Sequence, residues 1–213
     1  MPNELVYPRK DLIFWSYDTL VQKLSKREET HKRMLAAAGR SFRHNGYAGI
    51  GVDGIAKEAG VTSGAFYAHF GSKDGAFSAA VLDGLDEVIA GIPTFQQKNG
   101  SNWVEVFARY YLGADNRDNR ACGCAMSSLT SEVVRSDQEL RVLFESKMRK
   151  ITALVAKGFA GGTEEEKAAR AWSMLGVLIG GVNLARAMHS PELKEMISQN
   201  IIASAVQVAG KPI

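Results

Sequence analysis

Polar side chains that could contact a nucleic acid are concentrated in the segment VTSGAFYAHFGSK, which spans residues 61–73. The candidate contacts are Thr62, Ser63, Tyr67, His69 and Lys73. Short hydroxyls and a methyl can approach base edges, whereas tyrosine, histidine and lysine can reach phosphates. A helix that begins at Ser63 would also direct free backbone amides and the positive end of its dipole towards an anion. These residue types therefore indicate binding to a polyanion such as DNA.

Two short helices joined by a tight turn would position these side chains. Residues 52–59 are predicted as one helix, Gly60 allows the positive φ that the turn needs, and Ser63 opens the second helix. Apolar residues at helical spacing are expected to face inward: Ile55, Ala59, Val61, Phe66 and Phe70. This pattern predicts a helix-turn-helix, although the spacing also fits an ordinary pair of helices with a solvated polar face.

The rest of the chain also has helical periodicity, and no segment has the pattern of a strand, so we predict an all-α fold. Three further helices are expected in the first part of the chain: from the capping box Ser25/Glu28 to Gly46, from Ser72 towards Pro93, and from Gly100 to Ala114. A short helix should begin near Cys124, and another should cover Leu140–Val155. The last two are expected from the capping box Thr163/Glu166 to about Met188 and from Ser190 through Val208. Residues 115–120 are expected to form a polar loop.

Residues 30–77, THKRMLAAAGRSFRHNGYAGIGVDGIAKEAGVTSGAFYAHFGSKDGAF, resemble the N-terminal DNA-binding domain of the TetR/AcrR family of bacterial transcriptional regulators. The resemblance implies that Gly64 and Ala65 let the recognition helix lie close to DNA, and that the five polar residues above contact its bases or backbone. Many family members have Ser or Thr where this chain has Gly51. Glycine still caps a helix, but it brings no hydroxyl for a phosphate, so Gly51 is given no binding role.

The resemblance implies three segments: an extension over 1–24 with a possible extra helix, a helix-turn-helix domain over 25–75, and a helical effector-binding and dimerisation domain over 76–213. A loosely attached extension is the alternative for residues 1–24. Lys and Arg outnumber Asp and Glu by 11 to 8 in residues 1–75 and equal them, 15 to 15, in residues 76–213. The excess of positive charge therefore lies in the third of the chain that is expected to bind DNA.

The C-terminal part is expected to bind a small effector and to form a homodimer on a palindromic operator. Aromatic and sulfur-containing side chains would line the effector cavity: Trp103, Phe107, Tyr110, Tyr111, Cys124, Met126, Trp172 and Met174. The apolar run 171–182, with Gly176 and Gly180 four residues apart, and a stripe from Leu193 to Val208 would pair with a second copy, as the family implies. Ordinary core packing explains the same patterns without a partner.

Cys122 and Cys124 suggest a chemical sensor. A thiol at a helix start beside Arg120 would have a lowered pKa and would react with oxidants or electrophiles. The alternative is a small buried apolar residue, because one intervening residue is too few for a relaxed disulfide and two cysteines are too few for zinc.

No cofactor, metal site or catalytic constellation is expected, since the four histidines are scattered along the chain. The sequence has no secretory signal pattern and its longest apolar run is short for a bilayer, so we expect a cytoplasmic protein without membrane contact. The rival functions are a helical enzyme, or an adaptor that uses the cysteines or the C-terminal helices and does not bind DNA.

Overall fold

The computed structural model describes residues 25–210, and the regular elements of this part are all helices, which confirms the all-α prediction. The expected helix within residues 1–24 lies outside the described residues. The elements are α2 (Lys26–Asn45), α3 (Val52–Glu58), α4 (Ser63–Phe70), α5 (Lys73–Asn99), η1 (Gly100–Asn102), α6 (Trp103–Leu112), α7 (Ala114–Asp118), η2 (Arg120–Cys122), α8 (Ala125–Ser128), α9 (Thr130–Val133), α10 (Gln138–Lys157), α11 (Glu164–Ala187) and α12 (Pro191–Ala209).

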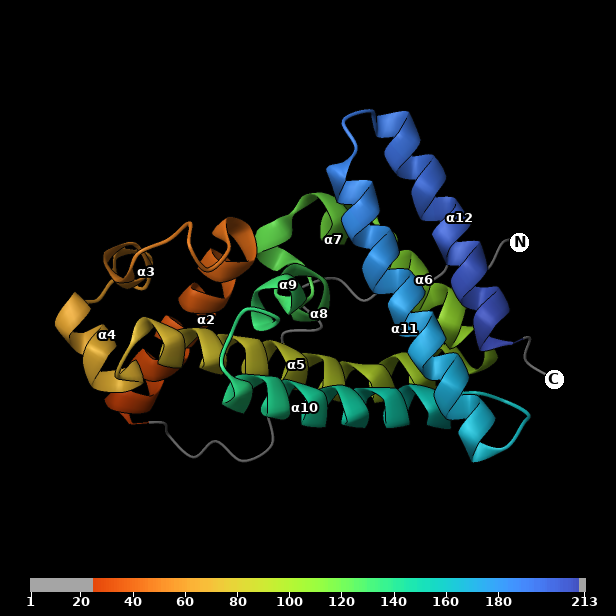
Figure 1. Cartoon of the computed structure of the whole chain (residues 1–213), viewed down its shortest axis with the longest axis horizontal. Helices are drawn as coiled ribbons and strands as arrows, with labels where there is room; N and C mark the ends of the chain where they lie inside the picture. Colours follow the sequence, from red (N-terminus) through yellow and green to blue (C-terminus); the bar gives the residue numbers. More distant parts are fainter. Residues whose placement is uncertain (1–24, 211–213) are drawn as a thin grey trace.

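The helices form a small N-terminal group and a larger C-terminal group (Figure 1). Helices α2, α3 and α4 gather around the first turns of α5. Helices α5 and α10 then lie side by side, α6 packs against both α5 and α12, and α11 and α12 form a closely packed pair. An N-terminal helix-turn-helix is thus joined to a larger helical bundle, with α5 continuous between them. The expected domain limit at residue 75 lies in the first turn of α5 and stays a prediction.

Both predicted capping boxes are confirmed. The Ser25 hydroxyl accepts from the Glu28 amide at 3.3 Å, and the Glu28 carboxylate accepts from the Ser25 amide at 2.8 Å. Thr163 and Glu166 make the equivalent pair at the start of α11, with distances of 3.2 and 2.7 Å. These reciprocal bonds satisfy amides that the first turn of each helix leaves free, and therefore fix where the helices begin.

Two sequence-based boundaries are wrong. Helix α5 continues six residues beyond Pro93 to Asn99, because Ile92 and Phe95 are buried on either side of the proline and tertiary packing holds the helix together. The expected polar loop at 115–120 contains α7, and Asn116 and Arg117 within it are buried. The Asn116 side chain donates to the Tyr111 carbonyl oxygen in α6, and the Arg117 side chain donates to Glu195 and Ser198 in the distant α12.

Helix α11 is the one described helix that is long and apolar enough to cross a membrane by length and composition. Core helices of soluble proteins pass the same test, and one face of α11 packs on α12, α10 and α6. At the crossing with α12, a side chain on Gly181 would begin only 2.4 Å from Ile201, so glycine is what allows this close approach. The apolarity of α11 is thus partly explained by packing within the chain.

Candidate nucleic-acid interface

The inner face of the helix-turn-helix is filled by the apolar side chains that the sequence predicted. Ile55 and Phe66 are fully buried, and the Phe66 and Phe70 ring centroids lie 5.1 Å apart. Gly60 has a φ of 66°, which gives the sharp turn between α3 and α4. Helix α4 has only eight residues and would be marginal alone, so these buried rings are what hold it against α2 and α3.

The opposite edge of α4 is open. Tyr67 is 52% exposed, and Gly64 is also exposed. A methyl group built on Gly64 would meet nothing nearer than the Thr62 hydroxyl at 3.9 Å. Packing within the chain therefore does not require glycine at this position. The absence of a side chain leaves room for another molecule to approach the helix.

The structure places the predicted contact residues in different local environments. The Thr62 hydroxyl is the N-cap of α4 and accepts from the Ala65 amide at 3.2 Å. The Ser63 hydroxyl donates to the Asp53 carboxylate at 2.5 Å. The Lys73 ammonium lies 4.4 Å from the centre of the Tyr47 ring, a cation–π contact at the start of α5. Thr62, Ser63 and Lys73 are thus oriented by neighbours that sequence reasoning did not identify.

His69 lies beside α2 rather than standing free. Its ring centroid is 5.4 Å from that of His31, and the His31 ring in turn packs against Phe70 at 5.1 Å. Partial burial, together with the neighbouring His31 and Arg27, lowers the pKa of His69. A histidine with a lowered pKa is neutral at neutral pH, so His69 offers a hydrogen bond rather than a positive charge.

Most of the expected effector-binding residues form closed core rather than a cavity wall. Trp103, Phe107, Tyr111, Met126 and Met174 are all at most 5% exposed. Their neighbours include Phe95, whose ring meets Phe107 edge-on at 5.2 Å, and Phe159, which stacks on Trp103 at 5.8 Å. Trp172 lies apart from this cluster, since it is 46% exposed on the outer face of α11, and its predicted contact with an effector stays a prediction.

One buried polar atom in this cluster lacks a hydrogen bond. The Tyr111 hydroxyl lies close to Cys124 and Ser127, yet it forms no hydrogen bond of acceptable geometry with any residue of the described range. Burial raises the pKa of Tyr111 well above its ordinary value, so the phenol keeps its proton. Burial likewise raises the pKa of the partly buried Tyr110 to about 12. The Tyr111 hydroxyl therefore keeps a proton that no well-aligned acceptor within the described residues receives.

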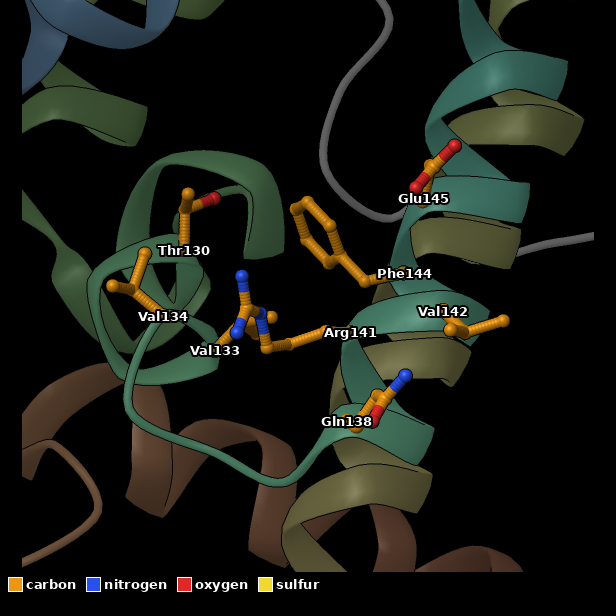
Figure 2. A pocket seen from close by; sticks show the side chains of 8 residues that line it. All are labelled: Thr130, Val133, Val134, Gln138, Arg141, Val142, Phe144 and Glu145. Carbon is orange, nitrogen blue, oxygen red and sulfur yellow. The ribbon is translucent and has the colours of Figure 1, made fainter.

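An open hollow of about 430 Å³ lies elsewhere, between α9 and the first half of α10 (Figure 2). Phe144 and Arg141 extend from α10 towards Thr130 and Val133 across this space. None of the predicted effector-binding residues lines it. The residues that do line it belong to α9, α10 and the turn between them. The spacing of these residues in the sequence did not indicate a pocket.

The expected low pKa of Cys124 is wrong. Cys124 does precede a helix, but α8 has only four residues, and burial of the thiol raises its pKa. The nearby positive charge that partly offsets this rise in the pKa of Cys124 comes from Arg43 and not from the expected Arg120. Cys122, by contrast, is exposed on η2. Among the described residues, no group of three or more His, Cys, Asp or Glu side chains is arranged to hold a metal ion.

Thiol labelling should therefore separate the two cysteines. We expect iodoacetamide at neutral pH to modify Cys122 first and Cys124 much more slowly, because the reactive thiolate is scarce at a buried thiol of raised pKa. Mass spectrometry at successive times measures the rate of modification at each cysteine. Cys122→Ser should abolish the fast modification and leave the slow modification of Cys124 unchanged. Equal rates at the two positions would contradict the placement of Cys124.

Comparison with known proteins gives a consistent result. The family model described as bacterial regulatory proteins, tetR family, matches residues 34–80, from α2 into α5. The HTH-type transcriptional regulator YdgC of Bacillus subtilis is 33% identical over 91 residues, which cover 43% of this chain and 47% of YdgC. The HTH-type transcriptional repressor NemR of Escherichia coli is 25% identical over 140 residues, which cover 64% of this chain and 70% of NemR. The match to YdgC thus spans about half the length of that relative.

Solved structures share the fold over most of the chain. The reduced form of E. coli NemR aligns with a TM-score of 0.70 at 18% identity, covering 86% of this chain and all of NemR. AibR, solved with isovaleryl coenzyme A and operator DNA, aligns with a TM-score of 0.60 at 15% identity, covering 82% of this chain and 97% of AibR. The helix-turn-helix of this chain thus matches the model of the tetR family of bacterial regulatory proteins, and the larger helical bundle shares the fold of these solved structures.

Proposed function

We propose that this regulator is a repressor that binds a palindromic operator as a homodimer and leaves it when a small effector binds. The observation that carries the proposal is the open edge of α4, where Tyr67 is exposed and a side chain at Gly64 would enter free space. Thr62, Ser63, Ala65, His69 and Lys73 border this edge and would complete the contact with bases and phosphates. AibR, which shares the fold, was solved on operator DNA.

Replacing Gly64 with leucine tests this interface. We expect operator affinity to fall at least about tenfold, on the order of 1–3 kcal/mol, because the added side chain keeps α4 from reaching the groove. Stability should change by less than about 0.5 kcal/mol, since the side chain enters open space. Fluorescence anisotropy with a duplex selected from a random pool measures the affinity, and thermal denaturation measures the stability.

Gly91→Leu is the matched control. Gly91 is also a helical glycine whose added side chain would meet nothing within 4 Å, but it lies in α5, 27 residues after Gly64. This variant should bind the operator as the unchanged protein does. Equal losses from the two substitutions would argue against α4 as the recognition helix.

Salt dependence separates a regulator from an enzyme or an adaptor. Affinity for duplex DNA should fall steeply with salt, because bound phosphates release their counterions. Lys73→Ala should weaken binding to all sequences and flatten that dependence. A helical enzyme or a protein-binding adaptor would show neither effect. We assign the protein to the regulators, acting in the cytoplasm where the operator lies.

The homodimer is supported by two apolar helices with an unoccupied face. Trp172 and Leu184 on α11 are 46% and 52% exposed, and Met196 on α12 is 55% exposed. Gly176 and Gly180, between the first two, have nothing within 4 Å of an added Cβ. A second copy packed here would set two α4 helices about one turn of DNA apart, roughly 34–36 Å, and the pair would read a palindrome.

The effector would bind near Tyr110, Tyr111 and Cys124, beside the core residues Trp103, Phe107, Met126 and Met174. The unpaired Tyr111 hydroxyl supports this location, because a ligand acceptor would satisfy it. The aromatic surroundings favour a hydrophobic compound, and no cofactor is required. A coupling free energy of about 1–3 kcal/mol between this site and α4 would lower operator affinity 5- to 150-fold.

A further inference from the structure

A short stretch of chain is held between the DNA-binding helices and the last two helices. We call residues 114–124, which comprise α7, Asn119, η2, Gly123 and Cys124, the strap. Helix α7 lies between α2 and α11 in Figure 1, and η2 packs against α2. The strap thus touches both groups of helices, although it is neither part of the helix-turn-helix nor of the α11–α12 pair.

Helix α11 holds the strap through Arg186. The Arg186 guanidinium donates to the carbonyl oxygens of Asn116 and Arg117 at 2.9 and 3.0 Å. It also donates to the hydroxyls of Ser127 and Ser128, both at 3.2 Å, just beyond the strap. All the nitrogens of this side chain are thus used, and burial lowers the pKa of Arg186. Such multiple charge-assisted bonds fix the strap backbone relative to α11.

Helix α12 holds the strap through Arg117. This side chain is only 8% exposed and donates to the Ser198 hydroxyl at 3.0 Å and to Glu195 at 3.3 Å. At Gly123 the strap also passes so close to α11 that a Cβ there would lie 2.5 Å from an Arg186 nitrogen. The strap therefore has little freedom to move relative to the two helices of the proposed dimer.

Helix α2 is joined to the other end of the strap through Arg43. Its Nε donates to the Ala121 carbonyl oxygen at 3.0 Å, a contact between residues 78 apart in the sequence. Arg43 lies in the last turn of α2, three residues before Gly46, where the chain leaves α2 for the loop that leads to α3 and α4. The orientation of the helix-turn-helix is thus connected to the backbone of η2.

From these contacts we propose that the strap positions the helix-turn-helix relative to the α11–α12 pair, with Arg186 and Arg43 as its positioning residues at the two ends. The inference rests on the proposed function, because it explains how a change near Cys124 or at the dimer helices would reach α4. The bonds form a contiguous route: α11 to the strap through Arg186, and the strap to α2 through Arg43.

The test uses Arg186→Gln, Arg43→Gln and the double variant in the full chain, with Arg170→Gln as the matched control. Arg170 is also an α11 arginine that donates to backbone carbonyl oxygens, those of Ala160, Gly161 and Ala209, and none of them is in the strap. Operator affinity is measured on a duplex that the unchanged protein selects from a random pool. Amide hydrogen exchange in the last turn of α2 is measured without DNA.

We expect Arg186→Gln and Arg43→Gln each to weaken operator binding at least about fivefold. The double variant should bind about as weakly as either single variant, because both bonds belong to one connection. Arg186→Gln should also speed exchange in the last turn of α2, more than 100 residues away in sequence. Arg170→Gln should change neither property, even where it lowers thermal stability as much.

Three results would overturn the inference: equal effects of Arg186→Gln and Arg170→Gln, multiplicative losses in the double variant, or unchanged exchange in α2 with Arg186→Gln. Failure of the proposed function looks different, because the unchanged protein would then select no duplex at all. In that case the exchange measurement alone decides whether the strap connects α11 to α2.

Discussion

Replacing both Gly176 and Gly180 with glutamate is expected to convert the protein to monomers and to reduce operator affinity by at least 100-fold. The two-fold axis of the proposed dimer would bring like charges together across the interface, which opposes association. A monomer loses the second recognition helix and with it the gain from bivalent binding, which is typically 10²- to 10⁴-fold. Sedimentation velocity measures the mass, and anisotropy on the selected duplex measures the affinity.

The fold should tolerate these two substitutions, because nothing lies within 4 Å of a Cβ at either glycine and glutamate is the better helix former. Gly91→Glu, at the equally open glycine of α5, is the control for added charge and should remain dimeric. A double variant that still sediments as a dimer would place the dimer contact on another face of the molecule.

Phe66→Ala is expected to have the largest effect on stability, about 3–5 kcal/mol of the free energy of unfolding. The ring is fully buried and contacts Phe70, and the short α4 has no other residue that is buried so completely. DNA binding should be lost together with the order of α4. Urea denaturation followed by circular dichroism measures the change in stability.

The neighbouring Tyr67→Ala provides the contrast. Tyr67 is 52% exposed, so its removal should change stability by less than about 0.5 kcal/mol while it still weakens operator binding. A loss of several kcal/mol from Tyr67→Ala, or a negligible loss from Phe66→Ala, would mean that the inner and outer faces of α4 are assigned the wrong way round.

Local signals in the sequence were sufficient wherever the structure depends on neighbours in the chain. The capping boxes at Ser25 and Thr163 act over three residues, and the turn at Gly60 needs one residue of positive φ. Phe66 and Tyr67 were separated into inner and outer positions by helical spacing alone. These features gave the all-α fold and the location of the helix-turn-helix.

Errors arose where distant residues decide the outcome. Helix α7 is polar in sequence, but Arg117 is buried because Ser198 and Glu195, about 80 residues later, accept its hydrogen bonds. Trp172 has the spacing of a core residue, yet it lies on the outer face of α11. Cys124 begins a helix, but that helix is short and burial outweighs its dipole. No local pattern contains this information.

The close fit of Ile201 over Gly181 has a consequence for how such regulators could diverge after gene duplication. Because this contact fixes α12 against α11 from inside, the outward residues Trp172 and Leu184 are free to vary without altering how the two helices sit together. In the proposed dimer, paralogues with different side chains at these positions would pair with themselves and avoid mixed assemblies, each keeping the same framework and acquiring its own operator.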